Sequence, residues 1–327
     1  MKTANFLKFD ITCPLCRSDK IKQARNFGCY KIFDCKNCKG SFSWPMTAIA
    51  YENKELENKD FNNTVKKSLR RNFVYCFVST FLQKISKQNI LDVGAGQGIT
   101  LFHAKRFGYK TYGTEVSDKT IKVLRDNCPF VEAVKTENFD NFSSSWPKKY
   151  DVISCLDVLE HTENPVLLLS KIKDKLNDDG FLIISLPNKD RYYYKLGGLV
   201  DDFVPKEHGG DNPPYHLTFW KKQTLEKILK RVGFDDYCVI TGGLIWRKNI
   251  QIKGRRSFIL SGLLKMFYLT CQFLPLFIID IFEKWGTHLI VVAKNGENRN
   301  ELKEDVKYTL KKIYKKQAPF FVDGEIE

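Results

Sequence analysis

The chain has 327 residues, 43% of them hydrophobic, which is enough for one large domain with a small module or for two medium domains. Its net charge of +15 favours anionic partners such as nucleic acid, an acidic membrane surface or phosphorylated substrates. The excess lysines are spread along the chain, however, which makes nucleic acid the less favoured partner. Residues 1–12 show no secretory signal, so we expect a cytoplasmic protein whose cysteines bind metal or lie in the core.

Two Cys-x-x-Cys pairs stand near the start of the chain. Cys13 and Cys16 are separated by eighteen residues from Cys35 and Cys38, which is the spacing of a structural zinc ribbon. Because all four predicted ligands are cysteines, no coordination position stays open for catalysis. The sequence leaves open whether this module, residues 1–45, binds RNA, an acceptor carried on a lipid or protein, or the catalytic domain.

Residues 46–88 are predicted to be a helical lead-in to the next domain. The apolar positions that indicate one amphipathic helix are Leu69, Phe73, Phe77, Phe81, Leu82 and Ile85.

From position 89 onward, strands and helices alternate as in a doubly wound α/β sheet. Strands are predicted at 90–93, 109–115, 131–134, 150–156, 180–186, 237–241 and 289–293. Helices are predicted at 99–107, 118–127, 164–176 and 222–232. Within this domain, 89–295, residues 189–215 are expected to form a lid and 242–287 an apolar helical insertion; a charged helix and tail, 296–327, follow.

Three glycines follow the first predicted strand of this domain. Gly94, Gly96 and Gly98 permit a tight turn and close approach of a ligand at a helix N-terminus. Their Gly-x-Gly-x-Gly spacing differs from the dinucleotide fingerprint. Asp92 precedes them, and Glu115 ends the second strand, where a carboxylate can accept ribose hydroxyls. A ligand-free turn and an NAD site are the alternatives.

Several segments together carry a family resemblance: LDVGAGQG (91–98), GTEVSD (113–118), YDVISCLDVLEHTENP (150–165), LNDDGFLIISLPN (176–188), PPYHLTFW (213–220) and THLIVVAK (287–294). In these segments the chain resembles the class I S-adenosylmethionine (SAM)-dependent methyltransferases, in the branch related to the ubiquinone O-methyltransferases. The resemblance implies a Rossmann-like sheet of seven strands, with the last strand antiparallel to the others.

The resemblance also implies cofactor-binding residues. They are Gly94, Ala95, Gly96 and Gly98 at the methionine part of SAM, Asp92 orienting that turn, Glu115 at the ribose, Val116 and Asn138 at the adenine, and Cys155 with Leu156 beside the sulfonium.

Methyl transfer from a sulfonium needs a base only when the acceptor must lose a proton. Imidazole suits that role near neutral pH. His161 follows the fourth strand, and His216 follows the lid, so these two are the candidate catalytic residues. Each has a structural alternative: His161 as a bridge between loop and helix, His216 as a hinge of the lid.

Basic residues precede an aromatic-rich apolar run inside the insertion. The longest uncharged piece, 266–279, is short for a membrane-spanning helix, so residues 247–282 are predicted to make a peripheral membrane contact. A lid helix or a dimer contact are the alternatives.

The sequence therefore predicts SAM-dependent methylation, at oxygen, of a small-molecule, sugar or lipid-linked glycan acceptor. Two alternatives stay open: an RNA methyltransferase that uses the zinc ribbon, and a non-catalytic SAM-binding scaffold.

Overall fold

A computed structural model describes residues 11–47, 61–85, 87–135, 147–190, 212–242, 288–296 and 299–317. Its strands are β1 (Ile21–Phe27), β2 (Tyr30–Cys35), β3 (Ser41–Trp44), β4 (Asn89–Val93), β5 (Lys110–Glu115), β6 (Glu132–Lys135), β7 (Tyr150–Leu156), β8 (Leu176–Pro187), β9 (Thr218–Phe219), β10 (Asp236–Gly242) and β11 (His288–Lys294). Its helices are α1 (Phe61–Arg71), α2 (Phe73–Ile85), α3 (Ile99–Arg106), α4 (Asp118–Asn127), the short 3-10 helix η2 (Leu159–His161), α5 (Pro165–Asp174), α7 (Lys222–Val232) and α10 (Arg299–Gln317).

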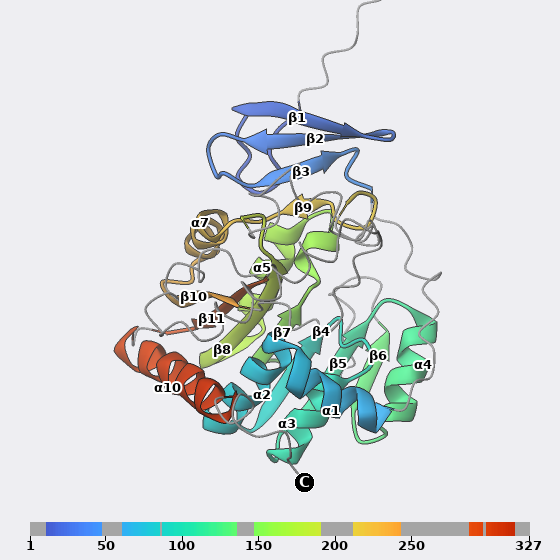
Figure 1. The fold of residues 1–327 in the computed structure, drawn as a ribbon, viewed down its shortest axis with the longest axis vertical. Coiled ribbons are helices and arrows are strands. Elements are labelled where there is room, and N and C mark those ends of the chain that lie inside the picture. Colours follow the sequence, from blue (N-terminus) through green and yellow to red (C-terminus); the bar gives the residue numbers. More distant parts are fainter. Residues whose placement is uncertain are drawn as a thin grey trace, which may run out of the picture.

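A seven-stranded sheet forms the centre of the larger part (Figure 1). Its order is β10-β11-β8-β7-β4-β5-β6, with β4, β5, β6, β7 and β8 parallel and β11 antiparallel to both of its neighbours. All seven strands predicted from the sequence are present, and the predicted antiparallel closing strand is confirmed. The central strands are buried on both faces, which explains their continuous apolar runs.

Each face of this sheet has its own apolar core. One face packs against α2, α3 and α10, through residues such as Phe81, Leu101 and Val306. The opposite face packs against α5 and α7, through residues such as Leu169 and Leu229. The result is a three-layer α/β arrangement in which the loops at the carboxyl ends of the strands are left for a site.

The lead-in differs from the single helix predicted. Two helices, α1 and α2, meet at Asn72. The Asn72 side chain accepts hydrogen bonds from the backbone N–H groups of Val74 (2.9 Å) and Tyr75 (3.4 Å), so it caps the start of α2. Asparagine at this position favours a helix start over a continuous helix, because its side chain replaces the missing backbone acceptors.

The charged C-terminal segment contains a helix that belongs to the core. α10 buries Leu302, Val306, Thr309 and Ile313, which recur at helical spacing on one side. This face packs against α2 and β10, and Lys303, Lys307 and Lys311 are exposed on the other sides.

The N-terminal module forms a second, smaller sheet in the order β1-β2-β3-β9 (Figure 1). β1 to β3 come from the cysteine-rich segment, whereas β9 comes from the part of the chain after the lid. Of the three roles that the sequence left open for the ribbon, the structure therefore shows docking on the catalytic domain. The predicted boundary at residue 45 stays a prediction.

Most of the lid and of the insertion lies outside the described residues, as do the expectations for membrane contact through 247–282. Among the helices that the structure describes, none is long and apolar enough to cross a bilayer.

Candidate functional site

The glycine turn after β4 adopts backbone conformations that favour glycine. Gly94, Gly96 and Gly98 have φ values of +70°, +53° and +88°. A Cβ on Gly94 would lie 2.6 Å from Val158, and one on Gly98 would lie 2.6 Å from Leu124. A Cβ on Gly96 would meet nothing within 4 Å. Two of the glycines are thus required by packing, while Gly96 faces the open space where a ligand can approach.

Asp92 lies at the end of β4, buried beneath this turn. Its Oδ1 accepts a hydrogen bond of 2.7 Å from the Ser154 hydroxyl on β7. Burial raises the pKa of the Asp92 carboxyl to about 7, although the Ser154 hydrogen bond lowers it; the neighbouring Glu115 charge adds to the rise. A cation bound next to Asp92 would favour the ionised form.

Glu115 ends β5 and reaches across to the glycine turn. One of its carboxylate oxygens accepts the Gly96 N–H (3.1 Å), and the other accepts the N–H groups of Val116 (2.8 Å) and Ser117 (3.4 Å). These bonds fix the carboxylate over the turn. Because Oε1 already accepts two N–H groups and Oε2 accepts one, Oε2 keeps one lone pair that can accept from the ribose.

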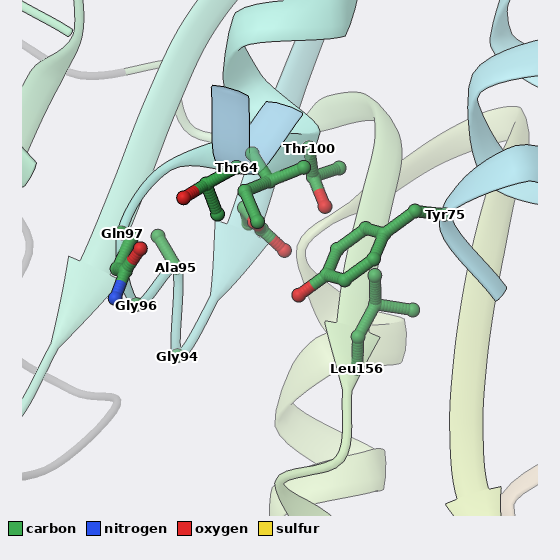
Figure 2. Close-up of a pocket in the computed structure, with 10 residues that line it drawn as sticks. Thr64, Tyr75, Gly94, Ala95, Gly96, Gln97, Thr100 and Leu156 are labelled. Atoms are coloured by element: carbon green, nitrogen blue, oxygen red, sulfur yellow. The ribbon is translucent and has the colours of Figure 1, made fainter. Parts of the chain in front are cut away.

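A cavity of about 360 Å³ opens at this turn (Figure 2). Its lining residues are Thr64, Tyr75, Asp92, Gly94, Ala95, Gly96, Gln97, Ile99, Thr100 and Leu156. Tyr75 points into the cavity from α2, opposite the glycine turn (Figure 2). Thr64 and Tyr75 were not predicted from the sequence, because their place in the cavity depends on how α1 and α2 pack against the sheet.

The other predicted cofactor residues are distributed around this cavity. Val116 is 51% exposed beside Glu115, as a residue flanking an adenine would be. Cys155 is fully buried in the core on the opposite face of β7 and does not line the cavity, whereas Leu156 does. Neighbouring strand residues point to opposite faces, so only Leu156 of the two lines this cavity, and contact of Cys155 with the cofactor stays a prediction. Asn138 lies outside the described residues.

Negative charges surround the Tyr75 hydroxyl. Burial raises the pKa of this phenol well above its usual range, and the charges of Asp157 and Asp92 raise it further. Tyr75 therefore stays protonated and brings a neutral hydroxyl to the cavity.

The two candidate histidines lie together. The rings of His161, in η2, and His216, before β9, are 4.7 Å apart and roughly perpendicular. His161 Nδ1 lies 2.6 Å from the Tyr215 carbonyl oxygen. Since a carbonyl only accepts, Nδ1 carries a proton, and in the neutral ring Nε2 carries the lone pair.

A buried carboxylate completes this group. Glu160 Oε1 lies 3.7 Å from His161 Nε2, and one ligand atom each from Glu160, His161 and His216 lie within 4.8 Å of one another. One carboxylate with two imidazoles can accept and pass on a proton, and such a set can also hold a divalent cation. Both histidines of this group were predicted from the sequence as candidate catalytic residues.

The four predicted zinc ligands also come together. One sulfur from each of Cys13, Cys16, Cys35 and Cys38 lies within 4.8 Å of the others. The Cys13–Cys38 and Cys16–Cys35 sulfur distances are 3.7 and 3.5 Å. Sulfurs on a zinc tetrahedron would be about 3.8 Å apart, given Zn–S bonds of roughly 2.3 Å. The residues therefore fit a structural Zn²⁺ ion.

The pKa values of these thiols shift in opposite directions. The pKa of Cys38 is lowered, chiefly because it accepts a hydrogen bond from Cys13, whose own pKa is raised by that bond and by burial. The Cys38 N–H also points at the Cys35 sulfur at 3.5 Å, as expected where thiolates need backbone donors.

A family model described as a methyltransferase domain matches residues 64–239, which is more than half of the chain. The chain belongs to the methyltransferase domain family. The matched region includes the glycine turn, Glu115 at the end of β5 and the η2 turn Leu159–His161, called the histidine turn below. The prediction of a class I SAM-dependent methyltransferase is confirmed.

Curated relatives are named ubiquinone biosynthesis O-methyltransferase. The one from Rickettsia bellii (strain OSU 85-389) is 28% identical over 144 residues, covering 42% of this methyltransferase and 57% of the relative. The one from Rickettsia canadensis is 27% identical over 181 residues, covering 51% and 71%. This methyltransferase thus spans little more than half the length of the first of these relatives.

Solved structures with similarity include a SAM-dependent methyltransferase from Archaeoglobus fulgidus, 19% identical with a TM-score of 0.45, covering 72% of this chain and all of that one. The plantazolicin methyltransferase BpumL, in complex with a pentazolic desmethylPZN analog and S-adenosylhomocysteine (SAH), is 20% identical with a TM-score of 0.46, covering 73% of this chain and 92% of that one.

Proposed function

We propose that this methyltransferase binds SAM on the Asp92–Gly98 turn and transfers the methyl group to a hydroxyl oxygen of a small-molecule, sugar or lipid-linked glycan acceptor. The observation that carries the proposal is the placement of two groups. The glycine turn follows β4 and the histidine turn follows β7, and these are adjacent parallel strands whose carboxyl ends share one edge of the sheet.

On the cofactor side, the open space above Gly96 receives the methionine part of SAM. Asp92 attracts its ammonium group, Glu115 accepts from the ribose hydroxyls, and Val116 lies against the adenine. Tyr75 supplies a neutral hydroxyl at the far side of the cavity.

On the acceptor side, one imidazole of the His161–His216 pair takes the proton of the acceptor hydroxyl. The oxygen lone pair attacks the methyl carbon as the carbon–sulfur bond breaks, and the sulfur keeps that electron pair, leaving SAH. The hydroxyl proton passes to an imidazole nitrogen. Oxygen as the acceptor atom is supported by the names of the curated relatives, which are O-methyltransferases.

The roles of His161 can be separated by a single substitution. His161→Asn keeps an N–H near the Nδ1 position, so the bond to the Tyr215 carbonyl is retained, but Nε2 is lost. If His161 acts on the proton, the methyl-transfer rate falls by about 10²–10⁴-fold while SAH affinity is unchanged. A rate close to that of the wild type would show that His161 is only a structural bridge.

His216→Gln tests the second histidine in the same assay. Equal loss in both variants is expected if the pair acts as a unit, because such effects are not additive. Measuring both variants with and without added Mg²⁺ separates proton transfer from a cation role: restoration by the cation would contradict the proton role.

An RNA partner is not needed to explain the presence of the ribbon, because the ribbon docks on the catalytic domain. Binding of RNA with a steep salt dependence would nevertheless favour the RNA methyltransferase. SAH binding without any methylated product would favour the non-catalytic scaffold.

A further inference from the structure

The segment that carries His216 is held from two sides. Leu217, the next residue, donates its N–H to the Glu160 carbonyl of η2 (2.7 Å) and accepts from the Ser43 N–H of β3 (2.8 Å). On the other side of His216, the Tyr215 carbonyl binds His161 Nδ1. The backbone next to His216 thus connects the cysteine ribbon directly to the histidine turn.

Strand pairing strengthens the connection to the ribbon. β3 pairs antiparallel with β9, with Phe42 opposite Thr218 and Ser41 opposite Phe219. Phe42 is fully buried and stacks on Phe33, with ring centroids 5.6 Å apart. A strand of two residues has little stability of its own, so β9 depends on β3 for its position.

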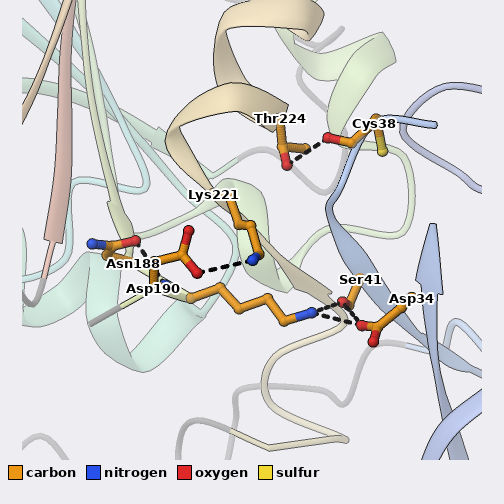
Figure 3. Close-up of polar contacts among 8 residues, drawn as sticks. Asp34, Cys38, Ser41, Asn188, Asp190, Lys221 and Thr224 are labelled. Carbon is orange, nitrogen blue, oxygen red and sulfur yellow. Dashed lines mark hydrogen bonds and ion pairs between the residues drawn. The ribbon is translucent and has the colours of Figure 1, made fainter. Parts of the chain in front are cut away.

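Side chains of the catalytic domain fasten the ribbon around this pairing (Figure 3). Lys189, which follows β8, binds Asp34 at 2.6 Å and also the Ser41 hydroxyl. Although burial raises the pKa of Asp34, the hydrogen bonds from Lys189 and Ser41 outweigh it, and the pKa is lowered. The ion pair therefore stays charged at neutral pH.

The metal-binding loops are fastened to α7. Thr224, which is fully buried, donates to the Cys38 carbonyl (2.9 Å), and Lys227 donates to the Asn37 carbonyl (2.7 Å). Arg231 donates to the Leu15 carbonyl in the first Cys-x-x-Cys loop (3.2 Å). Both loops that would hold zinc thus contact the helix that follows β9.

We infer that the cysteine ribbon is a positioning device for the acceptor side of the site: through β3, it holds β9 and with it His216 against His161 and Glu160. This inference rests on the proposed role of the two histidines. The described residues that line the cofactor cavity come from α1, α2, α3, the ends of β4 and β7 and the loop after β4, none of them from the ribbon. Loosening the ribbon therefore affects the histidines and leaves cofactor binding intact.

The test uses full-length protein with the double substitution Lys189→Met and Thr224→Val. It removes two attachments from the catalytic side and leaves all four cysteines in place. The matched control is Lys221→Met, because Lys221 pairs with Asp190 at 2.9 Å and acts on Asp34 of the ribbon only through its charge, without a hydrogen bond (Figure 3). If the double variant does not fold, Lys189→Met alone, which spares the buried Thr224, is compared with the same control.

Three readouts that need no acceptor are measured: amide hydrogen exchange of residues 215–219, the pH titration of the histidine rings by NMR, and SAH affinity by calorimetry. We expect exchange in 215–219 to accelerate by about 3- to 30-fold, through loss of the Lys189 and Thr224 hydrogen bonds. The titration curves of His161 and His216 shift, while SAH affinity changes by less than about twofold and the control matches the wild type.

Unchanged exchange and unchanged histidine titration in the double variant would overturn the inference. A loss of SAH affinity as large, in fold-change, as the acceleration of hydrogen exchange would also overturn it. The ribbon would then stabilise the whole domain and not the acceptor side in particular. Absence of methyl transfer by the wild-type protein would instead count against the proposed function, since none of the three readouts depends on turnover.

Discussion

Gly96 is the residue of the glycine turn next to which an added Cβ would find open space, and this open space points to a ligand. Gly94 and Gly98 are already required by contacts with Val158 and Leu124, so they do not separate a ligand site from a tight turn. At Gly96 the space is open, and the backbone N–H is fixed by Glu115. The turn therefore combines two glycines that packing requires with one, Gly96, for which we propose a role in binding.

Substitution of this glycine separates binding from stability. Gly96→Ala should lower the free energy of unfolding by only about 1–2 kcal/mol, the cost of a left-handed residue. Because its methyl group enters the ligand space, SAH affinity should fall by about tenfold or more. Urea unfolding and calorimetry measure the two effects.

Gly94→Ala is the matched control. Its Cβ would lie 2.6 Å from Val158, so the variant should lose a further 1–3 kcal/mol of stability, roughly, through overpacking. Equal stability losses in both variants, with SAH affinity kept in Gly96→Ala, would contradict the assignment of Gly96.

The raised pKa of Asp92 predicts a pH dependence of cofactor binding. Its folded-state pKa of about 7 lies above the ordinary value of 3.8, so in the absence of ligand the folded protein loses stability as pH rises from about 4 to 7. The ammonium of SAH prefers the ionised carboxylate. SAH affinity should therefore rise between pH 5.5 and 7, by at most about tenfold per unit, while the ligand's amino group stays charged.

Calorimetry across this pH range should also show proton release on binding. Asp92→Asn retains an acceptor for Ser154 but cannot ionise, so its SAH affinity should be weaker and independent of pH in this range. A pH dependence that persists in Asp92→Asn would assign the titration to another group.

Among the elements, the ribbon is the one whose stability we expect to depend most on a bound metal ion. Its strands bury few residues, and β1 is exposed along most of its length. We expect one zinc per chain by atomic absorption, and removal of the metal should unfold β1 to β3, since structural zinc commonly supplies about 10–16 kcal/mol.

Cys16→Ser and chelated wild-type protein should both lose the far-ultraviolet signal of these strands while the seven-stranded sheet persists. Retention of the ribbon without metal would show that contacts with α7 suffice to hold it.

Sequence patterns predicted the elements of the larger sheet because each carries its own periodicity and end signals. The alternation after position 89, the glycines after β4 and Pro165 at the start of α5 are all local features. The cysteine spacing is local in the same sense, and it predicted the cluster found in the structure.

What the sequence did not predict depends on contacts between distant segments. β9 has two residues and pairs with a strand more than 170 positions earlier, a pairing with no local signal. The break at Asn72 was hidden by continuous apolar spacing, and Tyr75 becomes a cavity residue only through the packing of α2. The sequence also did not predict which of two neighbouring residues of β7 lines the cavity: Leu156 does, and Cys155 does not.

At the scale of the whole molecule, the two sheets share the segment around His216. The larger sheet supplies the cofactor turn and the histidine turn, and the smaller sheet supports the strand that completes the acceptor side. Changes in the acceptor specificity of this methyltransferase are therefore expected to map to the 212–220 segment and the ribbon, and changes in SAM affinity to the ends of β4 and β5.

The central claim is that this chain transfers a methyl group from SAM. The most direct measurement is mass spectrometry of cell extract incubated with purified protein and SAM labelled in its methyl group. We predict a labelled small molecule with the wild-type protein, and little or none with Gly96→Ala or His161→Asn. If the wild-type protein binds SAH but no labelled product forms, the account of a catalytic methyltransferase is contradicted.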